Sequence, residues 1–172
     1  MPVLILCLFN NLLISDTLRI WDRKWHNINN VEMVITNYGT WDNPCYWPRG
    51  SNHNYIFGSG LWLGTIDSVF SDTLVSVGYG PHGGETEFGP GLYGQDPNAP
   101  YVIIYMYPDP WPAPIDTFPM APQRPKSDQD SWCCYNDCDS NYHVPGDTRP
   151  IGVEVYQTVY AWARNLLWTS YS

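Results

Sequence analysis

Cysteines and aspartates crowd into residues 128–139, where their side chains suit disulfide formation or metal binding. Carboxylate oxygens are the ligands that calcium prefers. The spacing of the helix-loop-helix calcium site, with its central glycine, is missing, so a solvated acidic loop is the simpler interpretation. The calcium candidates are Asp128, Asp130, Asp137 and Asp139.

Five cysteines occur, and all but Cys7 lie beyond the apolar amino terminus. Neighbouring side chains of an extended chain point apart, which disfavours a bond between Cys133 and Cys134. Two schemes remain: Cys45–Cys133 with Cys134–Cys138, or Cys45–Cys134 with Cys133–Cys138. Each bridge would contribute about 2–4 kcal/mol. Free thiols are one alternative. The other is a zinc site, which lacks paired C-x-x-C knuckles and would use Cys133, Cys134, Cys138 and His143.

Candidates for hydrolysis are weak. Glu85 and Glu87 would lie about 7 Å apart in an extended chain, within the range of inverting glycosidases. Such enzymes, however, take their two carboxylates from opposite sides of a cleft. The Gly58-Ser59-Gly60 run is not a complete nucleophile elbow. The histidines show no metal-ligand spacing and are expected to form loop hydrogen bonds; they are His26, His53, His82 and His143. A secreted hydrolase is therefore the third-ranked function.

Aromatic side chains are the stronger functional candidates, at 16% of the chain. One group falls in a loop region around residues 41–55, and another falls on one face of an expected strand at residues 156–162. Exposed rings beside polar side chains form sugar-stacking platforms, whereas the same rings between sheets form a core or a subunit contact. The ligand or interface candidates are Trp41, Trp47, Tyr55, Tyr156, Tyr160 and Trp162.

The elements that must position these rings have the period of β-strands. Residues 31–37 alternate, with Val31, Met33 and Ile35 on one side and Glu32 and Thr36 on the other. Residues 61–79 indicate a hairpin, and residues 101–107 a short buried strand. Residues 151–162 alternate over twelve positions and predict a long strand.

Residues 108–125 hold seven prolines and predict an extended crossing rather than a ladder strand. With the cysteines that follow, they define an expected Pro/Cys-rich insert at residues 108–150. The predicted fold class is therefore all-β: one antiparallel, β-sandwich-like domain over residues 16–172 with long Pro/Gly-rich loops.

Composition excludes several classes of partner. The chain of 172 residues carries 8 Lys and Arg against 17 Asp and Glu, a net charge of −9. Such a chain has no basic surface for phosphates, so we expect no nucleic-acid partner. No run of eighteen apolar residues occurs, so we expect no membrane span.

The amino-terminal segment at residues 1–15 is apolar up to Ser15 and precedes a polar sequence. This pattern is typical of a secretory signal that lacks its basic n-region, whereas an apolar strand or helix packed on the domain is the alternative. A signal would place the mature chain in an oxidising compartment, extracellular or at the cell surface.

Residues 30–91 contain the runs NVEMVITNYGTW, YWPRGSNHNYIFGSGLWLG, SDTLVSVGYGPHGG and EFGPG, and residues 147–163 read DTRPIGVEVYQTVYAWA. This order of motifs resembles the amino-terminal β-sandwich region of large secreted or cell-surface bacterial proteins with type IX-like sorting. The resemblance implies a multi-domain protein of which this chain is a fragment, and it carries no catalytic residues. The Pro/Cys-rich insert lies outside it.

We therefore expect a non-catalytic structural or adhesive module, able to build an extracellular filament or sheath from copies of itself or from further modules of the same protein. A carbohydrate-binding module that stacks glycans on its aromatic rings is the alternative. No cofactor is expected apart from the weak calcium candidate.

Overall fold

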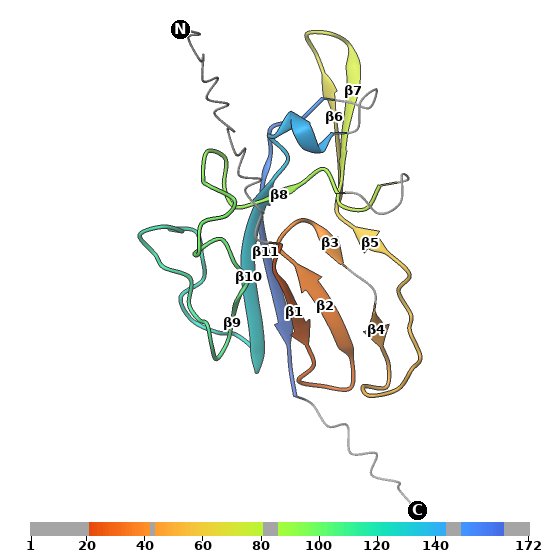
Figure 1. The fold of residues 1–172 in the computed structure, drawn as a ribbon, viewed down its shortest axis with the longest axis vertical. Helices are drawn as coiled ribbons and strands as arrows, with labels where there is room; N and C mark the ends of the chain where they lie inside the picture. Colours follow the sequence, from red (N-terminus) through yellow and green to blue (C-terminus); the bar gives the residue numbers. More distant parts are fainter. Residues whose placement is uncertain (1–20, 42–43, 81–85, 144–148, 164–172) are drawn as a thin grey trace, which may run out of the picture.

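The computed structural model describes residues 21–41, 44–80, 86–143 and 149–163. Within these ranges the regular elements are β-strands in antiparallel pairs and one short 3-10 turn, η1 (Ser140–Tyr142). Two sheets lie beside each other at the centre of the molecule (Figure 1). The predicted all-β, sandwich-like fold class is confirmed.

The first sheet has the order β1-β2-β4. Its strands are β1 (Arg23–His26), β2 (Glu32–Thr36) and β4 (Cys45–Tyr46). The strand predicted at residues 31–37 is therefore present. Thr36 was expected on its solvent-exposed face but is fully buried. The buried Thr36 hydroxyl donates to Thr40 O, and its carbonyl oxygen accepts from Gln157 Nε2 of the other sheet at 3.3 Å.

The second sheet is built around one strand. It contains β10 (Gln129–Asn136), β11 (Glu154–Ala161), β8 (Gly89–Pro90) and β9 (Tyr105–Met106). β10 pairs with β11 along its whole length, and with β8 and β9 on its other edge. Residues 108–150 are therefore not only an insert of loops, because they supply the central strand of this sheet.

Two smaller ladders complete the fold. β3 (Thr40–Trp41) pairs with β5 (Ser59–Gly60), and β6 (Trp62–Asp67) pairs with β7 (Asp72–Val77). The hairpin predicted at residues 61–79 is confirmed, and it extends away from the two sheets (Figure 1). The strand predicted at residues 101–107 shrinks to β9, since Val102 N instead bonds Ala99 O in a turn and Ile104 N bonds the Asp22 carboxylate.

One face of the second sheet packs against the first sheet. The rings of Phe88 and Tyr135 meet edge to face at 5.4 Å beside fully buried Ile35. A polar seam also joins the layers, because His26 Nε2 lies 2.8 Å from Ser131 Oγ. Gly39 has a φ of +75°, and a Cβ there would lie 2.9 Å from the Phe88 ring, so the chain needs glycine at this close approach.

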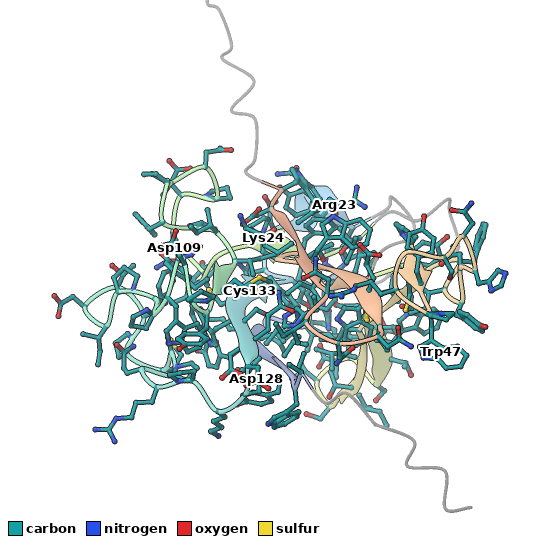
Figure 2. All side chains as sticks on the ribbon, turned by 90° about the horizontal axis from the view of Figure 1, so that it is seen from below. Arg23, Lys24, Trp47, Asp109, Asp128 and Cys133 are labelled. Atoms are coloured by element: carbon teal, nitrogen blue, oxygen red, sulfur yellow. The ribbon has the colours of Figure 1, made fainter. Side chains whose placement is uncertain are left out.

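The opposite face of β10 lies under the proline-rich chain. Phe118 packs on Trp132 with ring centroids 5.1 Å apart, and Tyr105 and Ala113 complete the contact. Because successive side chains of a strand alternate, Cys133 faces the inter-sheet core and Cys134 faces this outer cluster. β10 is thus buried on both faces (Figure 2, near Cys133).

Candidate binding surface

The outward face of β11 is open. Tyr156, Tyr160 and Trp162 keep 46%, 36% and 48% of their surface exposed. Directly across the ladder, Cys134 stands opposite Tyr156 and Asp130 opposite Tyr160. Both are buried, and Cys134 belongs to the outer cluster. The proline-rich chain therefore covers β10 but not β11. The exposed rings of Tyr156, Tyr160 and Trp162, on and just beyond β11, are called the aromatic ledge below.

Polar contacts orient the rings of the aromatic ledge. The Tyr160 and Trp162 centroids are 6.3 Å apart with the rings tilted by 35°, and Lys126 Nζ lies 5.5 Å from the Tyr160 centroid. Tyr156 Oη donates to Glu154 Oε2 at 2.9 Å. That hydrogen bond, followed by burial and the charge of Glu154, raises the pKa of Tyr156 above its ordinary value. The ledge is thus an uncharged aromatic surface with the acidic side chain of Glu154 at one end and the basic side chain of Lys126 at the other.

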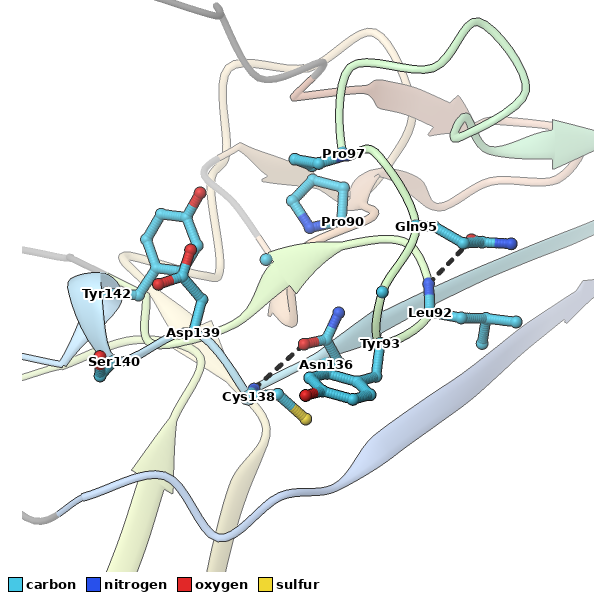
Figure 3. Close-up of a pocket in the computed structure, with 12 residues that line it drawn as sticks. Pro90, Leu92, Tyr93, Gln95, Pro97, Asn136, Cys138, Asp139, Ser140 and Tyr142 are labelled. Atoms are coloured by element: carbon cyan, nitrogen blue, oxygen red, sulfur yellow. Dashed lines mark hydrogen bonds between the residues drawn. The ribbon is translucent and has the colours of Figure 1, made fainter.

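Glu154 also connects the aromatic ledge to a cavity. Its Oε1 accepts the backbone N–H of Tyr93 at 2.8 Å, and Tyr93 forms part of the rim of a cavity of about 330 Å³. Figure 3 shows Tyr93 and Asn136 on one side of this space, with Asp139 and Tyr142 across from them. The lining is mostly polar and belongs to two chain segments, at residues 89–97 and 136–142.

The cavity walls are held by local hydrogen bonds. Asn136 Oδ1 accepts from Cys138 N at 3.0 Å, and Asn136 Nδ2 donates to Gly91 O at 2.9 Å. Gln95 Oε1 accepts from Leu92 N at 3.0 Å. Sequence reasoning missed this cavity, because neither segment carries a motif and only the β8–β10 pairing brings the two together.

The other aromatic candidates do not join the aromatic ledge. Trp41 packs against the inter-sheet core, whereas Trp47 and Tyr55 are 52% and 64% exposed. The last two rings meet edge to face at 6.3 Å in the chain between β4 and β5. Trp47 lies at the far side of the molecule from Asp109 and the proline-rich chain (Figure 2). The expected loop cluster is therefore split between core and surface.

The cysteine candidates are free thiols in this structure: Cys45, Cys133, Cys134 and Cys138. Neither predicted disulfide scheme is formed. Cys133 and Cys134 point into different clusters, as the extended-chain argument requires, and burial raises the pKa of Cys134 to about 12. Burial also raises the pKa of Cys133 well above its usual range. Both thiols therefore behave as small core side chains.

The calcium candidates are not brought together. Asp130 and Asp137 stand at opposite ends of β10, seven residues apart, or about 23 Å in a strand. The Asp137 carboxylate accepts from Ser76 Oγ, Ile151 N and Val153 N at 2.6–2.8 Å. The remaining two carboxylates accept backbone N–H groups nearby, Asp128 from Ala163 and Asp139 from Asn141. The four carboxylates are therefore not gathered at one point, because the strand β10 (Gln129–Asn136) separates them.

The hydrolytic candidates also separate. Glu85 and His82 lie outside the described residues. Glu87 is buried, accepts from Val77 N at 2.8 Å, and lies 3.4 Å from His143 Nδ1. Ser59 Oγ donates to Trp41 O in the β3–β5 ladder. In the part of the chain that the structure describes, no three His, Cys, Asp or Glu side chains gather as metal ligands, which includes the zinc candidates Cys133, Cys134, Cys138 and His143.

Comparisons with known proteins return no match: no family model, no curated protein and no solved structure is similar to this chain at a significant level. No helix among the described residues is long and apolar enough to span a lipid bilayer.

Proposed function

We propose that this chain is a structural or adhesive module of a secreted or cell-surface protein, and that it joins copies of itself through β11. The observation that carries the proposal is the position of β11. It ends the order of the second sheet among the described residues, and its outward face bears the exposed aromatic ledge.

The composition of β11 supports pairing with another strand. Natural edge strands are usually protected by lysine, proline, bulges or a covering loop. Residues 154–161 contain no lysine, arginine or proline, and Glu154 is their one charge. Eight residues make a strand longer than the average of about five or six. A long strand without such protection favours addition of a further strand.

Sedimentation velocity of the purified chain over a range of concentrations tests the proposal. Association should rise with concentration, and replacing Tyr156 and Tyr160 by serine should weaken it at least about tenfold through loss of aromatic contact. Trp47→Ser is the matched control, because Trp47 is 52% exposed and directly follows β4 of the other sheet. A chain that stays monomeric at all concentrations, or variants that associate alike, would overturn the proposal.

Carbohydrate binding is the second candidate, and the cavity with Tyr93 on its rim favours it. Glu154 accepts hydrogen bonds from both Tyr93 N at the cavity rim and Tyr156 Oη on the ledge, so one side chain connects the two. Stacking rings beside polar groups suit a sugar chain. Glycan-array binding that is lost in Tyr93→Ala and Tyr156→Ala, and kept in Trp47→Ala, supports this function; an array without signal rejects it.

A further inference from the structure

The backbone of β11 has a definite outward hydrogen-bonding pattern. Val153 O accepts from Asp137 N at 3.2 Å, and Ala161 O accepts from Asp128 N at 3.1 Å. Odd-numbered residues therefore direct their backbone groups toward β10. Because alternate residues of an antiparallel strand face opposite edges, the even-numbered residues direct their N–H and C=O groups outward. The residues whose backbone groups point to this free edge, away from β10, are Glu154, Tyr156, Thr158 and Tyr160.

This pattern limits how β11 can pair with itself. Hydrogen-bonded pairs must join two outward-facing residues, so an even position must face an even position. The centre of the strand falls between Gln157 and Thr158, and a two-fold axis there would place even against odd positions. Axes through Gln157 or through Thr158 are the nearest that satisfy the rule. The side chains distinguish the two.

We propose that two copies pair their β11 strands antiparallel about a two-fold axis through Thr158. Tyr156 of each copy then stands opposite Tyr160 of the other, which makes two aromatic cross-strand pairs on one face. An axis through Gln157 would instead place Tyr156 opposite Thr158, and no such pair would form. The inference rests on the function proposed above and specifies its partner and register.

Charge complementarity supports the same partner. Glu154 lies at the start of β11, whereas Lys126 lies over the Tyr160 ring near its end. Antiparallel pairing brings the Glu154 end of each strand to the Lys126 end of the other copy. Two unlike charges then meet at both ends of the contact. The pairing also satisfies about six outward backbone groups through Tyr156, Thr158 and Tyr160.

Cysteine cross-linking at the axis tests the register. Thr158 of one copy would face Thr158 of the other with Cα atoms about 5.5 Å apart, within disulfide range. Under mild oxidation, Thr158→Cys should give a covalent dimer well above the background of the wild-type chain. Thr65→Cys, at an exposed threonine of strand β6, is the control and should stay at background.

A proline variant tests the edge itself. The Thr158 N–H points outward, so Thr158→Pro removes no bond to β10 but blocks pairing with a second copy. Association should fall at least about tenfold with an unchanged circular dichroism spectrum. Thr158→Lys is the second variant, should proline disturb the strand, and should weaken association in the same direction.

The outcomes separate the register from the function. Association that persists without cross-linking at position 158 overturns this register and leaves the assembly function standing. Association that is unaffected in both folded Thr158 variants overturns edge pairing. A wild-type chain that never associates overturns both proposals. Measurements at about 0.15 M salt limit the repulsion between two chains of charge −9.

Discussion

β10 and β11 pair over eight residues each but lie in opposite environments. Six residues of β10 are buried, whereas β11 has only exposed and partly exposed residues. β10 is covered by the first sheet on one face and by the proline-rich chain on the other. Two strands of one ladder therefore serve separate roles: β10 holds the fold together, and β11 presents a surface.

The largest expected effect comes from the aromatic residues of the two strands. Trp132→Ala on β10 should cost about 4 kcal/mol of unfolding free energy, since it opens a cavity beside Phe118. Trp162→Ala, just beyond β11, should cost under about 1 kcal/mol because the ring is half-exposed. Urea unfolding measures both. Equal costs would contradict the division between a buried strand and a surface strand.

Asp137 joins the two strands, and its loss should have the next largest effect. The fully buried carboxylate accepts four hydrogen bonds, from Ser76 Oγ and from three backbone N–H groups at residues 151–153. Asp137→Ala leaves these donors unpaired and should cost about 3 kcal/mol in urea unfolding. Asp139→Ala, at the partly exposed start of η1, is the control and should cost about 1 kcal/mol.

His26 should make the contact between the sheets sensitive to acid. Burial lowers the pKa of His26 from 6.5 to about 4, although the charge of Asp130 opposes this in part. Between these pH values the unfolded chain binds a proton that the folded chain does not, so stability falls as the pH drops from about 6.5 to 4. The His26 contribution is roughly 2 to 3 kcal/mol.

Thermal unfolding at a series of pH values checks the effect of His26. His26→Gln should flatten this part of the profile, because glutamine keeps a hydrogen-bonding group near Ser131 without titrating. His53→Gln is the control, since His53 is exposed. If His26→Gln leaves the pH profile unchanged, His26 is not the cause of the loss of stability in acid.

The smallest effect is expected on the aromatic ledge. Glu154→Gln should lower the pKa of Tyr156 toward its ordinary value, because the charged acceptor of the Tyr156 hydroxyl is gone. Ultraviolet difference titration against the wild-type chain measures this change. Unfolding free energy should change by less than about 0.5 kcal/mol, since the group is at the surface. A large loss of stability would place β11 among the structural strands.

The alternation of residues 151–162 predicted both β11 and the face that carries Tyr156, Tyr160 and Trp162. A strand with one buried and one solvent-exposed face alternates apolar and polar residues, and this alternation can be recognised in the sequence. β10 has no wet face, so Gln129–Asn136 shows no alternation, and its place among prolines and cysteines suggested an insert. The β6–β7 hairpin was predictable for the same reason as β11, because its residues alternate and a turn-like sequence joins its two strands.

Contacts between distant segments decided the rest. Long-range pairing of chain segments placed Cys133 in the core rather than beside another thiol. It also gave Asp137 backbone N–H groups as partners and brought together the two segments that line the cavity. Local residue patterns carry the two-residue period of a strand, so they determined the class of fold and the outer face of β11. Burial and hydrogen-bond partners belong to residues far apart in the chain, and only the packed sheets brought those residues together.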